Sequence, residues 1–600
     1  MVPAAVGWLL IGIHVCFFSQ FFPNAQGKLG HDYQYNLPLL LDGYYWFLHN
    51  GPWSLPWFTP SFCGGMPLMA NPATFYCSTT QWFTFLTDPL SAVRLTLALF
   101  GTLGFWGMYL LLATVFRSGR WAALLGGGLF LFNGLFAWRM VVGHLEFHAF
   151  MLTPLIAYFL LRPEAAGPLR PWAVVRNGVC VGLMLGYAFM SGMTQLIVPA
   201  LIAVVIIAAL ARLTPGTEVD SQGFVLRLAG GGILALGLSA AKLAAALAFL
   251  GNFPRDSYLL PGVDGLVKLI AFIIHVLTTG GAGVDAEGVL TNSQWTLGRH
   301  EFEFGLTWAP WLLMALGLAL NGGWQRTCAA IGSRRQLPCL ALCLLLLAIP
   351  LALNYYSPAW NQFLKTIPFI RNLSNFIRWL IIYIPCIVIL AAVAVERTPL
   401  LHRFAPSVVG ATLAWVVVGN IAMDTSYYHH EPYDPAPVVE AYWRTRERGE
   451  PPVIATQVAS LDETGQPSLP MARNDVLIHG QSQILCYEPM FGFRLEFLPF
   501  KGIRPGPSLA AQGDELNVKN PACYLYPHEN GCTPGDPFRV GEEDEAQRFI
   551  SFHPFSYRVS RWQRVADWLN LCSLLALPIW ALGYGWAAWR FSRRAPGEGR

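Results

Sequence analysis

The chain has 600 residues, of which 54% are hydrophobic and only 12% are charged, and its mean hydropathy is +0.43. This composition excludes an ordinary soluble protein and is typical of a polytopic membrane protein, in which aromatic residues gather at both water interfaces. The net charge is +4, and no run rich in Lys or Arg suggests nucleic-acid binding. We therefore expect membrane lipids, and no nucleic acid, among the partners.

Twelve apolar runs approach the length of about 20 residues that a membrane-spanning helix needs. They lie near 4–22, 92–115, 121–138, 147–161, 175–191, 194–211, 228–250, 305–320, 338–353, 379–395, 406–423 and 567–589. The runs at 147–161 and 305–320 are short for a span, so tilted or re-entrant segments remain open there. We predict about twelve transmembrane helices.

Arginines gather in one set of short loops and in the C-terminal tail. They are Arg117, Arg120, Arg162, Arg170, Arg176, Arg212, Arg227, Arg326, Arg334, Arg335, Arg397, Arg403, Arg590, Arg593, Arg594 and Arg600. Because positive residues mark cytoplasmic loops, we expect both termini in the cytoplasm. The predicted organisation is a transmembrane domain at 1–424 with outer loops at 23–91, 251–304 and 354–378, an extracytoplasmic domain at 425–565, and a last span with a basic tail at 566–600.

The segment 425–565 contains roughly half of the 35 acidic residues and many Pro and Gly residues. Its patterns predict a small α+β domain, periplasmic or extracellular, with helices at 438–448 and 542–551 and strands at 452–459, 475–479, 484–487 and 557–559. Cys523 and Cys532 are nine residues apart in a compartment that permits disulfides, so a local bridge is plausible, although Cys63, Cys77 and Cys486 leave the pairing open. The absence of a CxxC pair argues against a structural metal.

The large loop after the first span begins with Gly30-His31-Asp32-Tyr33. An amphipathic stretch follows at 37–48, where we expect Asp42 and His49 to face water while apolar side chains lie in the membrane interface. A second interfacial stretch is expected at 265–277. Paired interfacial helices around an outward-facing cavity suit a lipid-linked substrate.

Ionisable residues recur near the predicted outer membrane face, where charge is costly and tends to mark a functional site. They are Arg139, His144 and Glu146 between the third and fourth spans, Lys242 inside the seventh, Glu301 and Glu303 before the eighth, and Arg371 and Arg378 before the tenth. Arg371 and Arg378 share one face if their segment is helical, and can then hold a phosphate. The simpler alternatives are a solvated turn, a structural ion pair and contact with lipid headgroups.

Five sequence motifs, in order over residues 1–424, resemble the YfhO-type bacterial membrane proteins of the GT-C glycosyltransferase superfamily. They are HDYQYNLP, GGMPLMANPATFY, AWRMVVGHLEFHAFMLTPL, AAKLAAALAFLGNFPRDS and IPFIRNLSNFIRW. The resemblance implies an integral membrane enzyme that takes a sugar from a polyprenyl-phosphate donor at the outer face of the bacterial cytoplasmic membrane. It also implies that Asp32, the acidic residue of the first outer loop, is the catalytic base, whereas HEFEFG matches the family more loosely.

An inverting transfer to a glycan or lipid acceptor needs a carboxylate that takes the hydroxyl proton and cations that stabilise the departing phosphate. Asp32 meets the first need, and Arg139, Lys242, Arg371 and Arg378 meet the second, with His144 as a further donor. Glu146, Glu301 and His31 can hold sugar hydroxyls or assist the base. Because cationic side chains can replace a divalent metal, we expect no required cofactor, although a divalent metal is possible.

Two other classes of protein compete with a transferase. A twelve-span lipid or glycan transporter or flippase has the same layout, but carriers of that type usually show two related halves, whereas the large loops here follow spans 1, 7 and 11. A non-catalytic membrane assembly subunit would have charged loops that do not converge.

Overall fold

The computed structural model describes residues 2–23, 27–164, 170–253, 260–293, 297–320, 336–368, 370–373, 375–429, 433–459, 475–484 and 502–594. Within these ranges nine helices are long and apolar enough to cross a membrane. They cover Val2–Ser19, Pro89–Val115, Arg120–Val141, Pro171–Met190, Thr194–Leu213, Ser221–Asn252, Leu337–Asn354, Ile377–Arg397 and Arg561–Trp586. Each coincides with a predicted span.

The remaining three predicted spans coincide with shorter apolar helices at Leu145–Leu161, Ala309–Leu320 and Ala405–Ile421. The helix at Ala309–Leu320 has 12 residues, which reach only about 18 Å at the rise of an α-helix. The count of twelve spans therefore stays a prediction.

The helices of the apolar part of the chain are these: α1 (Val2–Ser19), α4 (Pro89–Leu110) with the π-turn η1 (Leu111–Val115), α5 (Arg120–Leu131), α6 (Gly134–Val141), the 3-10 segment η2 (Leu145–Leu152), α7 (Thr153–Leu161), α8 (Arg170–Met190), α9 (Thr194–Leu213), α10 (Ser221–Asn252), α13 (Ala309–Leu320), α15 (Leu337–Asn354), η5 (Ile377–Ile382), α17 (Tyr383–Arg397), α18 (Pro399–Arg403), α19 (Ala405–Ile421) and α25 (Arg561–Arg594).

The segments predicted to lie outside the membrane contain α2 (Tyr33–Asn50), β1 (Phe58–Thr59), β2 (Met66–Pro67), α3 (Thr79–Phe83), β3 (Val263–Asp264), α11 (Leu266–Thr278), α12 (Ala286–Val289), η3 (Arg299–Phe302), β4 (Tyr355–Tyr356), α16 (Pro358–Thr366), η4 (Ile370–Asn372), η6 (Ser426–His429), α20 (Ala436–Arg448), β5 (Gln457–Ala459), η7 (Asp475–His479), β6 (Gln481–Gln483), β7 (Gly506–Pro507), β8 (Ala511–Gln512), β9 (Glu515–Lys519), α22 (Ala522–Leu525), α23 (Pro527–Asn530), β10 (Pro537–Arg539), η9 (Val540–Glu542) and α24 (Glu543–Ile550).

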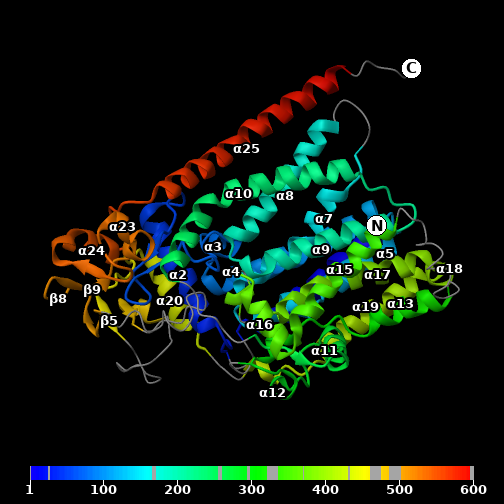
Figure 1. Cartoon of the computed structure of the whole chain (residues 1–600), viewed down its shortest axis with the longest axis horizontal. Coiled ribbons are helices and arrows are strands. Elements are labelled where there is room, and N and C mark those ends of the chain that lie inside the picture. Colours follow the sequence, from blue (N-terminus) through cyan, green and yellow to red (C-terminus); the bar gives the residue numbers. More distant parts are fainter. Residues whose placement is uncertain are drawn as a thin grey trace.

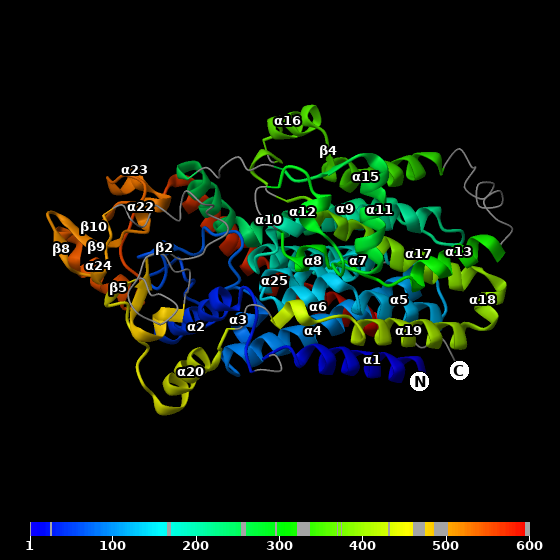
Figure 2. The ribbon, with the colours of Figure 1, turned by 90° about the horizontal axis from the view of Figure 1, so that it is seen from below.

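The helices run side by side along the molecule, and the strand-rich region lies at one end (Figures 1 and 2). The N-terminus and the last turns of α25 lie at the opposite end in both views. Helix α5 is central because three consecutive glycines, Gly126 to Gly128, let its neighbours approach closely. A Cβ on Gly127 would lie 3.0 Å from the Phe105 ring of α4, and one on Gly128 would meet Leu413 of α19.

The strand-rich region contains two three-stranded sheets, in the orders β6-β5-β7 and β10-β9-β8. The predicted helices at 438–448 and 542–551 are present as α20 and α24, and β5 lies within the predicted strand at 452–459. The strand predictions at 475–479 and 557–559 are wrong: the first is the 3-10 turn η7 and the second is irregular. The 484–487 prediction extends outside the described residues. A disulfide joins Cys523 to Cys532, with Cα atoms 5.9 Å apart.

Helix α2 corresponds to the predicted amphipathic stretch, but it does not expose Asp42 to water. Asp42 is 1% exposed and accepts hydrogen bonds from the hydroxyls of Thr59, Ser61 and Tyr76. The reason is that the loop folds back on itself, since all three partners lie within residues 59–76 of the same loop. The segment after residue 433 packs on this loop as well: Tyr442 of α20 donates to the Thr84 carbonyl over 2.6 Å. The first outer loop is therefore part of the folded core.

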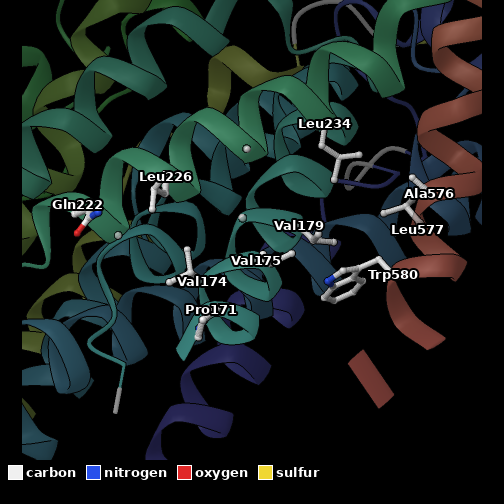
Figure 3. A pocket seen from close by; sticks show the side chains of 13 residues that line it. Pro171, Val174, Val175, Val179, Gln222, Leu226, Leu234, Ala576, Leu577 and Trp580 are labelled. Atoms are coloured by element: carbon white, nitrogen blue, oxygen red, sulfur yellow. The ribbon is translucent and has the colours of Figure 1, made fainter. Parts of the chain in front are cut away.

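A separate apolar crevice lies between α8, α10 and α25 (Figure 3), where α25 diverges from α10 toward its C-terminal end.

Candidate functional site

Asp32 lies immediately before α2, where the first outer loop docks on the turn after α6. Its backbone N–H donates to the Val142 carbonyl over 3.0 Å, and Asn36 Nδ2 donates to the Gly143 carbonyl over 2.9 Å. Gly143 has a φ of 94°, and a Cβ there would lie 3.0 Å from the Asp32 carbonyl carbon, so the close approach requires glycine. The Asp32 side chain is 27% exposed. The loop thus holds a carboxylate in place with part of it accessible.

His144 contacts Asp32 and a guanidinium through its two ring nitrogens. Arg139 Nη1 donates to Nδ1 over 2.9 Å, and because a guanidinium is only a donor, this Nδ1 carries no proton. The proton of the neutral imidazole then lies on Nε2, which donates to Asp32 Oδ2 over 2.8 Å. Arg139 therefore selects the tautomer that orients the Asp32 carboxylate.

Glu301 is enclosed by two arginines. Arg139 donates to both carboxylate oxygens, over 2.9 and 2.8 Å, and Arg378 Nε donates to Oε2 over 2.9 Å. Burial raises the pKa of Glu301, but the two guanidinium groups outweigh it and hold that pKa well below its usual range. The Arg378 side chain is 19% exposed, so part of this guanidinium is accessible.

Two amides complete the support of Arg378. Its Nη1 donates to the Gln195 Oε1, and Asn375 Nδ2 donates to Glu301 Oε2 over 3.1 Å. Residues from α6, α9, η3 and η5 therefore meet in this network.

His300 and His31 form an aromatic wall beside the network. His300 Nδ1 lies 2.8 Å from the Tyr427 hydroxyl, and the His31 ring lies 4.7 Å from the Tyr427 ring. Burial, reinforced by His144 and Arg139, holds the pKa of His300 well below its usual range, so this imidazole is neutral near pH 7. Glu303 lies nearby and accepts hydrogen bonds from Arg299 and Tyr428 over 3.0 Å each. These bonds give Glu303 a structural role.

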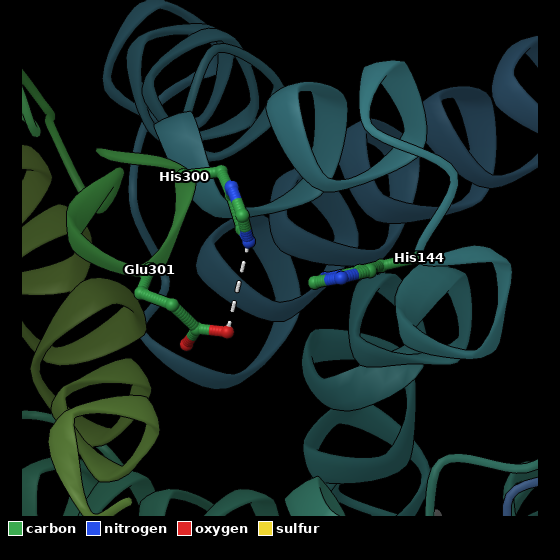
Figure 4. A group of neighbouring side chains, drawn as sticks. All are labelled: His144, His300 and Glu301. Atoms are coloured by element: carbon green, nitrogen blue, oxygen red, sulfur yellow. Dashed lines mark ion pairs between the residues drawn. The ribbon is translucent and has the colours of Figure 1, made fainter. Parts of the chain in front are cut away.

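His144, His300 and Glu301 also bring potential metal ligands within 4.8 Å of one another (Figure 4). The two histidine rings approach from opposite sides, with Glu301 beside His300. This group is consistent with the expectation that a divalent metal is possible. In the present arrangement both nitrogens of His144 are hydrogen-bonded and the carboxylate of Glu301 is paired with two guanidinium groups, so a cation here would displace these partners.

A cavity of about 550 Å³ opens beside the network. Its lining includes the charged and titratable side chains Asp32, His144, Glu146 and Arg378, together with Asn36, Asn71 and Gln195. The lining also has an apolar wall, which includes Ile197 and Val198 from α9, Leu243, Leu247 and Leu250 from α10, and Leu373 and Trp379. This mixed lining suits a polar headgroup that is attached to a lipid chain.

The predicted site residues are thus divided into three groups. Asp32, His144, Glu146 and Arg378 line the cavity, whereas Arg139, Glu301 and His31 lie behind its lining. Lys242 and Arg371 are also absent from the described lining.

Lys242 is buried in α10, where its Nζ donates to the carbonyls of Thr74, Phe189 and Met190 over 3.0, 3.3 and 3.1 Å. The sequence indicated a buried cation correctly, but carbonyls that are remote in sequence satisfy it. The expectation that it contacts a phosphate is not supported by this geometry.

Arg371 does not share a helical face with Arg378. It lies in the short turn η4, which residues outside any helix separate from η5, and its side chain is exposed. Its backbone carbonyl accepts a hydrogen bond from Lys365 Nζ over 3.0 Å. The condition for a shared helical face is not met, because this segment is not one continuous helix, and a phosphate contact of Arg371 stays a prediction.

Sequence reasoning missed Gln195, Asn375 and His300 as members of the network. Asn375 and His300 lie within the charged motifs that drew attention to Arg378 and Glu301, so their neighbourhood was the available signal. Gln195 follows the turn between α8 and α9, and nothing in its local sequence distinguishes it from an ordinary polar residue.

No protein-family model and no curated protein matches the sequence. Among solved structures, the chain is similar to the oligosaccharyltransferase of Archaeoglobus fulgidus in its apo form and tethered with an acceptor peptide containing the NVT sequon via a disulfide bond. Both alignments have 14% identity and a TM-score of 0.40 and cover 93% of this chain and 74% of that one. For the complex of the same protein with Zn and sulfate, the identity is 14%, the TM-score is 0.37, and the coverage is 79% of this chain and 62% of that one. Similarity at this level carries no argument about fold or function.

Proposed function

We propose that this protein is an inverting membrane glycosyltransferase of the GT-C type, which moves a sugar from a polyprenyl-phosphate-linked donor to the hydroxyl of a glycan or lipid acceptor at the outer face of the cytoplasmic membrane. One observation carries the proposal. The carboxylate of Asp32, held by His144, and the guanidinium of Arg378, held by Glu301, line the same cavity, and that cavity also has an apolar wall.

The proposed chemistry uses the two charged groups in different roles. Asp32 takes the proton of the acceptor hydroxyl while the oxygen attacks the anomeric carbon of the sugar. The bond from that carbon to the phosphate oxygen breaks, and the electron pair leaves with the polyprenyl phosphate. Arg378 stabilises the charge that develops on the departing phosphate. His144, through its Nε2–H, keeps the reactive carboxylate of Asp32 oriented.

The apolar wall supports a donor that is carried on a lipid. Leu243, Leu247 and Leu250 recur at spacings of four and three, which puts them on one face of α10 toward the cavity. A polyprenyl chain can lie against this face while the phosphate reaches Arg378. Arg139 and Glu301 act behind the lining as positioning residues.

The two competing functions make different use of the same residues. In an assembly subunit the charged loops need not meet, whereas Asp32, His144, Glu301 and Arg378 form one connected network here, which favours a reaction centre. A lipid or glycan transporter or flippase would also need an apolar wall, but it has no need of an oriented base.

The test is sugar transfer by purified protein in proteoliposomes, with a panel of radiolabelled polyprenyl-phosphate hexoses as donors and cell-envelope glycan and lipid extract as acceptors. Asp32→Asn should reduce transfer by about a hundredfold or more, the lower end of the effect of losing a general base, with little change in folding. Asp264→Asn is the matched control, because Asp264 is an exposed carboxylate that forms a surface pair with Lys268.

Near-normal transfer by Asp32→Asn would remove Asp32 from the mechanism. Movement of intact donor across the bilayer without transfer, equal in the parent and the Asp32→Asn variant, would replace the transferase with a flippase. The absence of both activities from the parent would favour the assembly subunit.

A further inference from the structure

The crevice between α8, α10 and α25 is a second cavity, with a volume of about 650 Å³ (Figure 3). Its walls are Pro171, Val174, Val175 and Val179 from α8, Leu226 and Leu234 from α10, and Ala576, Leu577 and Trp580 from α25. All but Gln222 of the labelled side chains are apolar. On α10, the lining residue Leu226 lies 17 positions before Leu243 of the proposed active site, which corresponds to about 25 Å along the helix.

The crevice exists because α25 contacts the neighbouring helices α10 and α8 near its start and near its end, and is separated from them between these two places. Near its start, Gln563 Nε2 donates to the Ala241 carbonyl over 3.1 Å and Asn570 Nδ2 to the Gly237 carbonyl over 3.3 Å. Near its end, Gly583 lies against Trp172 of α8. Between these contacts Gly230 of α10 faces open space, since a Cβ there would meet no atom within 4 Å.

A cluster of charge lies where α7 ends and α8 and α10 begin. Glu164 Oε1 is 3.4 Å from Arg162 Nε, 3.6 Å from Arg176 Nη2 and 3.8 Å from Arg227 Nη2. Arg227 is buried and also donates to the carbonyls of Leu160 and Arg162, which completes the end of α7. Three guanidinium groups around one carboxylate leave an excess of positive charge, and Arg162 and Arg176 are 28% and 30% exposed.

Two contacts connect this arginine cluster to the crevice. Arg176 Nη1 donates to the Tyr584 hydroxyl over 3.4 Å. The ring of Tyr584 is stacked on that of Trp580, with centroids 5.7 Å apart, and Trp580 lines the crevice. The cluster therefore lies at the end of an apolar slot, at the side of the membrane that the arginine distribution predicts to be cytoplasmic.

We propose that the crevice and the arginine cluster together form a binding site for an anionic glycerophospholipid of this leaflet. An acyl chain occupies the apolar slot, and the phosphate lies against Arg176 and Arg162, whose planar guanidinium groups pair well with phosphate oxygens. The excess of positive charge selects an anionic headgroup over a zwitterionic one. The bound lipid fills the space that α25 leaves open, and it does so independently of the transferase reaction.

The experiment measures lipid binding to the full-length purified protein by native mass spectrometry, with dioleoyl phosphatidylglycerol, dioleoyl phosphatidylcholine and inorganic phosphate as separate probes. We expect the parent to bind phosphatidylglycerol more tightly than phosphatidylcholine and not to respond to inorganic phosphate. Arg176→Gln should weaken phosphatidylglycerol binding by about fivefold, the value of one basic residue at a lipid headgroup. Arg403→Gln, an arginine on the same predicted side, should leave it unchanged.

A second pair of variants tests the slot itself. Gly230→Leu adds a side chain at a residue that lines the crevice and where a Cβ meets no atom within 4 Å. It should reduce the binding of phosphatidylglycerol and of phosphatidylcholine by similar factors. Gly232→Leu is the matched control, since it lies on the same helix, its Cβ also meets no atom within 4 Å, and it does not line the crevice. Thermal unfolding in detergent verifies that all four variants fold.

Equal binding of the two lipids by the parent, or unchanged binding by both Arg176→Gln and Gly230→Leu, would overturn the proposal. A response to inorganic phosphate alone that matches the response to phosphatidylglycerol would replace the lipid with a free anion. Each outcome is independent of sugar transfer, so failure here leaves the proposed enzyme function untouched.

Discussion

His144 is the residue on which the orientation of the proposed base depends. Its neighbours determine its tautomer: Arg139 can only donate, so Nδ1 must accept, and Nε2–H is directed at Asp32. Like Arg139, His144 positions another residue and does not contact the bond that reacts. The two residues explain why a carboxylate that is partly open to the cavity keeps one orientation.

Two substitutions of His144 should distinguish the contribution of its hydrogen bond from that of the volume of its ring. In His144→Gln the amide N–H can take the place of Nε2–H, so we expect transfer to fall by less than about tenfold, whereas His144→Phe should lose about a hundredfold. The measurement is the pH dependence of kcat/KM in proteoliposomes. A purely structural ring predicts the reverse order, with the Phe variant closer to the parent.

Arg378 differs from the other candidate cations because it both lines the cavity and has three anchoring contacts. A lysine ammonium is a point charge that cannot reproduce the bonds to Glu301 and Gln195 together. Arg378→Lys should therefore raise the donor KM by about tenfold, the scale of one charged hydrogen bond. Arg371→Lys is the matched control, and equal effects in the two variants would contradict the assignment of the phosphate contact to Arg378.

Helix α10 is held to the turn between α8 and α9 by one lysine. The Nζ of Lys242 satisfies three carbonyls that would otherwise lie buried without this donor. Lys242→Met should lower the free energy of unfolding by roughly 1–3 kcal/mol, the cost of leaving a buried polar group unsatisfied.

The donor affinity of Lys242→Met should stay that of the parent, because Lys242 does not line the cavity. Thermal unfolding in detergent and binding of polyprenyl phosphate are the two measurements. Lys268→Met is the control for loss of a lysine, since the Lys268 side chain is 71% exposed. Weaker donor binding at unchanged stability would restore Lys242 to the donor site.

Helix α2 is joined to the β1–β2 turn region through the buried carboxyl of Asp42. Burial raises the pKa of this carboxyl to about 6, although the hydroxyls of Ser61, Thr59 and Tyr76 lower it in part. In the unfolded chain the group titrates near its ordinary value of about 4. Between these two values the folded state holds the proton more tightly, so the contribution of Asp42 to stability falls as the pH rises from about 4 to about 6.

Asp42→Asn should remove this pH dependence and raise the apparent Tm at pH 7.5. The gain in the free energy of unfolding is at most about 3 kcal/mol, the equivalent of a shift of about two pKa units. The check is a comparison of Tm at pH 5 and pH 7.5 for the parent and the variant. The parent should lose more Tm over this interval than Asp42→Asn does. An identical pH profile for both would show that the buried carboxyl is not what titrates.

At the scale of the whole molecule, the arginine distribution predicts the orientation in the membrane. Reporters fused near Gly216 or Arg600 should stay in the cytoplasm, because these two sites lie on the side of the arginine-rich loops. A reporter at Gln512 should be exported. Activity of alkaline phosphatase and fluorescence of green fluorescent protein at the three sites measure this. A cytoplasmic reporter at Gln512 would reverse the topology and remove the outer-face reaction with it.

Features that depend on local pattern could be predicted from the sequence alone. Hydropathy located the nine long membrane-length helices, and helical periodicity located α20 and α24, because each pattern is contained within one element. It also drew attention to Asp32, Arg139, His144, Glu301 and Arg378, since charge near a membrane face is conspicuous wherever its partner lies.

Which of these charges meet, and which are merely structural, depends on long-range packing. Asp32 and His144 are 112 residues apart and Arg139 and Glu301 are 162 apart, so no local pattern relates them. Lys242 donates to backbone carbonyls, and Asp42 is buried among hydroxyls of its own loop where amphipathicity predicted water. The physical reason is that burial follows the packing of distant segments, and a buried charge takes whichever partner that packing brings to it.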